Sequence, residues 1–199
     1  MDANELLRLD QIRQLRLAEG ASHEERVGRL TCTLALALDL GPDKAELLGA
    51  AAVLHDVGKT GIPDAILRKP GPLDDDEWAI MQTHPRRGHA VLAGNREGFL
   101  ATAAAIALAH HEAFDGSGYP HRLRGDAIPF EARIVALADV YAALREPRPY
   151  REPATHEAAA AIILGGDGRT GPSRFDPAVL EAFRRAEQAF DLIVSASAA

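Results

Sequence analysis

Apolar residues recur along the chain at the three- and four-residue spacing that is typical of α-helices. Leu6, Leu9, Ile12 and Leu15 would line one face of a first helix. The same spacing predicts further helices over residues 22–40, 43–55, 97–112, 130–144 and 155–164. No segment shows the apolar–polar alternation of a β-strand. The pattern therefore predicts an all-α fold, a single bundle of about seven to nine helices.

Local signals support these boundaries. Gly41-Pro42 ends one predicted helix and begins the next. Asp74, three residues before Glu77, resembles a capping box that opens a helix through Met81. Comparable signals open three later helices: Pro129, Thr155 and Asp176-Pro177.

Composition and charge narrow the functional classes. The 199 residues suit one domain with a sizeable core. A net charge of -7 argues against a protein that coats a nucleic acid polymer, although metal ions and a few arginines could still receive a small phosphodiester. The single cysteine, Cys32, cannot form an internal disulfide. Charged residues throughout 2–16 argue against a signal peptide or membrane span, so the prediction is a cytoplasmic protein without membrane attachment.

Imidazole and carboxylate side chains recur on segments that are otherwise apolar. Such groups are costly to bury unless they are paired or bound to a metal. The candidate ligands are Glu19, His23, His55, Asp56, His84, His110, His111 and Asp139. One octahedral ion takes about six donors and a catalytic site keeps positions open, so this set indicates a polynuclear site with a bridging carboxylate. Mixed histidine and carboxylate ligation without thiolate favours iron or manganese over structural zinc, although nickel, cobalt or zinc could occupy such a site.

A series of motifs in the same order resembles a known family. His55-Asp56-Val-Gly-Lys59 is similar to the signature of the HD superfamily of metal-dependent phosphohydrolases, and the continuation resembles its HD-GYP subfamily. The resemblance extends from Glu19 to Phe190. It includes Gly61-Ile-Pro63, His84-Pro85, His110-His111-Glu112, Asp115-Gly-Ser-Gly-Tyr-Pro120, Ile128-Pro129, Ala132-Arg-Ile134, Ala138-Asp-Val-Tyr141, Arg148-Pro-Tyr-Arg151 and Phe175-Asp-Pro177.

The resemblance implies a domain organisation and an activity. Residues 1–18 would form an N-terminal helical extension, and residues 19–199 the HD-GYP phosphohydrolase domain with a loop that carries the GYP motif. The family hydrolyses cyclic di-GMP to linear pGpG, GMP or both, in bacterial second-messenger signalling. The implied cofactors are two or three divalent metal ions, iron or manganese.

The resemblance also assigns roles to individual residues. Six candidate ligands fall on its metal positions, with Asp56 as the expected bridge and catalytic residue: His55, Asp56, His84, His110, His111 and Asp139. Glu19 and His23 fall on the two positions that distinguish three-metal members from two-metal ones. Lys59 matches a catalytic lysine near the attacking water or the substrate phosphate. The other substrate-binding positions are Tyr119, Arg148 and Arg151, where guanidinium groups suit phosphate oxygens.

The implied mechanism is metal-assisted hydrolysis. Two ions would lower the pKa of a bridging water that attacks phosphorus in line, while the metals and Lys59 neutralise the developing charge. The loop around Tyr119 would shape the site and contact diguanylate cyclases with a GGDEF domain. The leucines of the first helix would favour a homodimer.

The chain departs from the family pattern after Asp139. Ala142 stands where many members carry a second aspartate, and Arg145-Glu146-Pro147 is also less typical. A missing carboxylate beside the metals could weaken metal retention or slow turnover.

Several readings remain open from the sequence. Glu19 and His23 could be an ordinary exposed helix pair, and Arg148 and Arg151 could be plain surface charges. A guanine pocket cannot be recognised, so the substrate could be another cyclic dinucleotide. Ala142 leaves room for a catalytically weak module that binds nucleotide or a signalling partner.

Overall fold

The computed structural model describes residues 21–94, 97–147 and 152–196. Their α-helices are α2 (Ala21–Ala37), α3 (Pro42–Ala52), α4 (Asp64–Leu67), α5 (Asp75–Met81), α6 (His84–Leu92), α7 (Phe99–Ala109), α8 (Phe130–Leu144), α9 (His156–Gly165) and α10 (Pro177–Ala196). Short 3-10 helices lie at η1 (Val57–Gly61), η2 (Gly125–Ala127) and η3 (Pro172–Arg174). The described residues form no β-strand, and the predicted all-α fold is confirmed.

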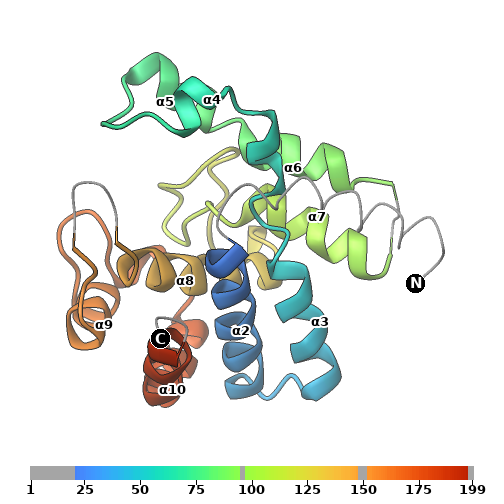
Figure 1. Cartoon of the computed structure of the whole chain (residues 1–199). Coiled ribbons are helices and arrows are strands. Elements are labelled where there is room, and N and C mark those ends of the chain that lie inside the picture. Colours follow the sequence, from blue (N-terminus) through green and yellow to red (C-terminus); the bar gives the residue numbers. More distant parts are fainter. Residues whose placement is uncertain (1–20, 95–96, 148–151, 197–199) are drawn as a thin grey trace.

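Helix α2 lies at the centre of the packing. It contacts α3, α8 and α10, while α7 contacts α3, α6 and α8 (Figure 1). The α4–α5 segment lies away from this bundle, at the end that α6 and η1 also approach (Figure 1). The largest fully buried apolar side chains include Leu30, Leu48, Ile106, Leu137, Phe183 and Phe190. Burial of this leucine- and alanine-rich surface is the main contribution to folding.

Several helix ends agree with the predicted signals. Asp74 accepts a hydrogen bond from the Glu77 backbone N–H, and the Glu77 side chain accepts one from the Asp74 N–H, so the capping box is confirmed. The Thr155 side chain accepts a hydrogen bond from Ala158 N–H at the start of α9. Helix α8 spans the predicted residues, with Pro129 at its N-cap.

Other boundaries differ from the prediction. Helix α3 ends at Ala52, because His55 and Asp56 lie in a turn that leads directly into η1. Helix α7 covers less than the predicted 97–112, so His110 and His111 stand at its C-terminal end. Helix α6 is absent from the predicted set. It begins at His84-Pro85, where proline occupies the first turn and its missing N–H costs nothing.

The described helices include none that is both long and apolar enough to cross a bilayer. The predicted N-terminal extension, residues 1–18, lies outside the described residues.

Candidate metal centre

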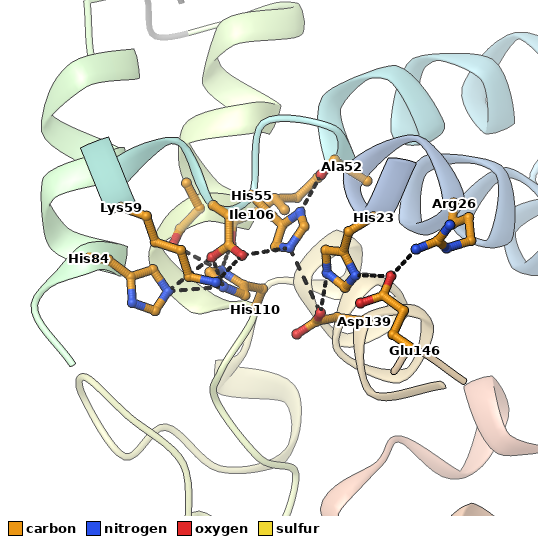
Figure 2. A network of polar contacts seen from close by, with 12 residues as sticks. His23, Arg26, Ala52, His55, Lys59, His84, Ile106, His110, Asp139 and Glu146 are labelled. Atoms are coloured by element: carbon orange, nitrogen blue, oxygen red, sulfur yellow. Dashed lines mark hydrogen bonds and ion pairs between the residues drawn. The ribbon is translucent and has the colours of Figure 1, made fainter. Parts of the chain in front are cut away.

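Three buried histidines are oriented by the backbone of their own segments. The Nδ1 atoms of His55, His84 and His110 lie 2.8, 2.8 and 3.1 Å from the carbonyl oxygens of Ala52, Met81 and Ala107, each three residues earlier. A carbonyl oxygen only accepts, so each Nδ1 carries the proton and donates it. In the neutral ring Nε2 is then the atom with the lone pair, the arrangement found in metal-ligating histidines. Figure 2 shows these rings converging from the turn before η1, the start of α6 and the C-terminal end of α7.

The Asp56 carboxylate lies between these histidines. Its Oδ1 is 3.2 Å from His84 Nε2 and 3.6 Å from His110 Nε2, and its Oδ2 is 3.3 Å from His55 Nε2. Asp56, His84, His110 and His111 together offer ligand atoms within 4.8 Å of one another. This first cluster matches the donor set of a divalent cation bound by nitrogen and oxygen.

A second cluster shares the same interior. His23 from α2, His55 and Asp139 from α8 also offer ligand atoms within 4.8 Å of one another. Asp139 Oδ1 lies 3.2 Å from His23 Nε2 and 3.8 Å from His55 Nε2. Asp56 contacts His55 of the second cluster with one oxygen and His84 of the first cluster with the other, so its carboxylate lies between the two clusters.

The electrostatics keep both carboxylates ionised. Burial alone would raise the pKa of Asp56, but the charge of Lys59 and the contacts with His55 and His110 hold it well below its usual range. For Asp139, burial is likewise outweighed by the hydrogen bond from His23 and by His55, and its pKa is lowered. Burial and the neighbouring His110 lower the pKa of His111, so this imidazole is neutral and able to ligate.

Lys59 and His23 place positive charge beside these carboxylates. Lys59 Nζ lies 2.5 Å from Asp56 Oδ2, and although burial opposes its charged form, Asp56 raises its pKa. Burial alone would lower the pKa of His23. Its hydrogen bonds to Asp139 and Glu146 outweigh this effect and raise the pKa to about 10. These two cations offset the negative charge of Asp56 and Asp139.

Unpaired buried atoms show that the polar centre is incomplete without a ligand. His55 Nε2 and Asp56 Oδ1 are buried and have no hydrogen-bond partner among the described residues. Leaving such a group unpaired costs about 1–3 kcal/mol. Divalent cations held by the two clusters would satisfy both atoms, and the donor set, free of thiolate, fits them. The residues present therefore fit a metal centre.

A close approach of two backbones brings the ligands together. Segment η1, which follows His55-Asp56, packs on α6, which carries His84. Gly58 and Gly88 meet at this crossing: a Cβ added at Gly88 would lie 3.2 Å from Gly58 N and 3.3 Å from Ala107 Cβ. Glycine is needed here for its lack of a side chain.

The loop that contains Tyr119 covers one side of the first cluster. The Tyr119 ring lies 4.8 Å from the His111 ring and 6.4 Å from that of His84, centroid to centroid. Burial and the nearby Asp56 raise the pKa of its phenol, which stays protonated. The same residue lines a pocket of about 450 Å³ together with Arg86 and Arg122.

A buried carboxylate and a glycine hold this loop in place. Glu112 accepts hydrogen bonds from the backbone N–H groups of His121, at 2.7 Å, and Leu123, at 2.9 Å. Gly118 lies so close to the 111–113 backbone that an added Cβ would stand 2.3 Å from Ala113 N. These contacts fix the loop that places Tyr119 against His111.

A profile described as HD domain matches residues 9–179. The chain belongs to the HD domain family. The resemblance stated from the sequence motifs is thereby confirmed.

Named relatives of this HD domain act on cyclic dinucleotides. It is 49% identical, over 78% of its length, to a cyclic di-GMP phosphodiesterase of Vibrio cholerae, and 42% identical, over 84%, to a 3'3'-cGAMP-specific phosphodiesterase of the same organism. It spans about a third of the length of these relatives, 32% and 31%. A solved structure of Bd1817, an HDG"Y"P protein from Bdellovibrio bacteriovorus, shares the fold with a TM-score of 0.63 at 20% identity, covering 87% of this chain and 51% of that one.

The structure brings most of the predicted site residues of the HD domain together. Those that meet at the two clusters or beside them are His23, His55, Asp56, Lys59, His84, His110, His111, Tyr119 and Asp139. Glu19, Arg148 and Arg151 lie outside the described residues, so their predicted roles stay predictions.

Sequence reasoning missed two residues of this polar network. Glu146 Oε1 lies 2.8 Å from His23 Nδ1 and also accepts a hydrogen bond from Arg26. Glu146 lies 123 positions from His23 in the sequence, and its only signal was the atypical stretch at residues 145–147.

Two other motif residues are structural. Arg133 Nη1 donates to Asp176 Oδ2 at 2.6 Å, which ties α8 to the start of α10. The same guanidinium donates from Nε to the Ile128 carbonyl at 3.0 Å. This pair therefore explains the Ala132-Arg133 and Asp176-Pro177 motifs without a role in chemistry.

Proposed function

We propose that this HD domain is a metal-dependent phosphodiesterase that hydrolyses cyclic di-GMP to linear pGpG, GMP or both. One observation carries the proposal: a single buried carboxylate, Asp56, stands between two ligand clusters and leaves an oxygen without a partner. The relatives that act on cyclic dinucleotides support the substrate class.

The described residues suit two ions, and Glu19 would add a donor for a third. Iron or manganese is proposed, because imidazoles and carboxylates supply all the donors and no thiolate is among them. When bound, such ions polarise a phosphodiester and lower the pKa of a nearby water. His55, His84, His110, His111 and Asp139 would hold them together with Asp56 and His23.

The chain's own groups would then serve the reaction around these ions. Lys59 Nζ lies beside Asp56, where a cation stabilises negative charge that develops on the phosphate. The protonated Tyr119 hydroxyl can donate a hydrogen bond to the substrate. Arg148 and Arg151 are proposed to bind its phosphates as bidentate donors.

The test compares metal content and hydrolysis in His55→Ala/Asp56→Ala with those of the unaltered protein. The variant is expected to lose its bound metal and its hydrolysis of cyclic di-GMP together. His89→Ala, a histidine outside both clusters, is the matched control and should keep both. Wild-type turnover in the double variant would overturn the proposal.

A second substrate is 3'3'-cGAMP, which a relative at 42% identity is named for. Rates measured on a panel of cyclic di-GMP, 3'3'-cGAMP and cyclic di-AMP would rank the candidates. Tight binding without product in fully metallated protein would instead favour a nucleotide-binding signalling module.

Proposed partners follow from the same family. A GGDEF-domain diguanylate cyclase would dock on the loop around Tyr119, and a homodimer would form through the leucines of the N-terminal segment. A second-messenger substrate agrees with action in the cytoplasm.

A further inference from the structure

The ring of His23 is held between two carboxylates from opposite sides. Its Nε2 lies 3.2 Å from Asp139 Oδ1, inside the second cluster, and its Nδ1 lies 2.8 Å from Glu146 Oε1, outside it (Figure 2). A carboxylate only accepts, so Nδ1 carries a proton that it donates to Glu146. This contact fixes the plane of the imidazole and aims Nε2 at the cluster.

Arg26 holds Glu146 in turn. Arg26 lies three residues after His23 on α2, so both side chains leave the same helix face. Its guanidinium donates to the Glu146 oxygen that His23 also contacts. The side chains of Arg26 and Glu146 are only 12% and 19% exposed, so water screens this arrangement weakly.

Glu146 is placed to orient a ligand and is poorly placed to be one. It belongs to neither cluster of candidate ligands. Its Oε1 already accepts hydrogen bonds from His23 and Arg26. A carboxylate on the far nitrogen of a metal-ligating histidine orients the ring and raises its basicity.

Glu146 lies near Ala142, the position at which many members of the family carry a second aspartate. Ala142 is fully buried on α8 and brings no carboxylate to this region. Glu146 follows two residues after the end of α8 and brings one to His23 from the adjoining segment.

We propose that Glu146 is a positioning residue that orients His23 for metal binding, with Arg26 holding its carboxylate. This rests on the proposed metal centre. In this chain, the carboxylate that contacts the outer nitrogen of His23 is thus that of Glu146, from the segment after α8.

The experiment titrates manganese retention in the full chain. Mn²⁺-loaded protein is dialysed against graded chelator, and metal equivalents per chain are counted for the unaltered protein, Glu146→Ala and Glu146→Gln. Glu146→Ala is expected to weaken the retention of one equivalent about 10- to 100-fold. Glu146→Gln keeps an acceptor for Nδ1–H and should lose less. Asp191→Ala is the matched control, because it removes an acidic partner of the neighbouring Arg145 without touching His23.

Two readouts separate positioning from a merely structural role. The Nδ1–H resonance of His23 in nitrogen-15 spectra should be protected in the unaltered protein and in Glu146→Gln, and lost in Glu146→Ala. Unchanged manganese retention in both variants, with a melting temperature lowered equally with and without metal, would overturn the inference and leave the proposed function standing. Absence of binding of both manganese and ferrous iron in the unaltered protein would overturn both.

Discussion

Gly58 approaches His84 so closely that a Cβ added to the glycine would stand 2.0 Å from the His84 carbonyl oxygen. The neighbouring atoms are backbone, including Gly88 N at 2.4 Å, so they cannot turn aside as a side chain would. The contact between η1 and α6 therefore sets the distance between Asp56 and His84.

Gly58→Ala should separate these two ligands. We expect a loss of stability of about 1–3 kcal/mol from overpacking, together with loss of metal from the first cluster. Thermal unfolding and metal analysis would measure both. Gly61→Ala is the control in the same 3-10 helix, since an added Cβ there meets only the flexible Arg87 side chain, at 3.1 Å. Equal behaviour of the two variants would contradict the prediction.

Lys59→Met should separate chemistry from metal binding. Lys59 lies beside Asp56 but is not among the candidate ligands, and bound cations would replace its charge. We expect near-normal metal content with kcat reduced about 100- to 1000-fold, as when one group that stabilises the transition state is removed. Steady-state kinetics on cyclic di-GMP with parallel metal analysis would show this, and an unchanged kcat would exclude a catalytic role for Lys59.

Removal of metal should destabilise the protein. Ions that bind only the folded state add about 2.7 kcal/mol at a concentration a hundred times Kd. Treatment with chelator is thus expected to lower Tm, and added manganese to restore it. In the His55→Ala variant, which lacks a donor of the second cluster, the shift should shrink. A Tm insensitive to chelator in the unaltered protein would contradict the metal centre.

Glu112→Ala should release the loop around Tyr119. Two backbone N–H groups would lose their acceptor, with an expected cost of about 1–3 kcal/mol. Trp78, the sole tryptophan, lies 5.9 Å from the Tyr119 ring, centroid to centroid, so its fluorescence reports the position of the loop. We expect altered emission from Trp78 and slower turnover. Glu157→Ala on α9 is the control, and the same spectrum in both variants would argue against the anchoring role of Glu112.

The helices and ligand types that the sequence could predict are those marked by local signals. The helix over 130–144 has both a strong apolar repeat and a proline at its start, and its bounds agree with those of α8. The capping box at Asp74 and Glu77 needs only contacts within one turn. The ligand types could be recognised because each of them lies on an apolar segment or in a known motif.

The features that the sequence could not predict depend mainly on contacts between residues far apart in the chain. Glu146 contacts His23 and Arg26, which lie on α2 more than a hundred residues earlier in the sequence. Helix α6 was missed because it is short and begins at His84-Pro85, where a proline can equally mark a break. The conformation of segment η1 depends on its packing against α6, and no periodic pattern in the sequence predicts it.

The hydrogen bonds from His55, His84 and His110 to carbonyl oxygens three residues earlier have a consequence for how the centre assembles. Each imidazole takes its tautomer and ring orientation from its own stretch of backbone, so the entropy of ordering these donors is lost during folding and not when a cation arrives. A cation would thus meet rings that the backbone already orients, and we expect exchange of one ion for another to leave the helices in place. Adaptation to a different metal would then fall on the carboxylates, Asp56 and Asp139, whose partners come from elsewhere in the chain.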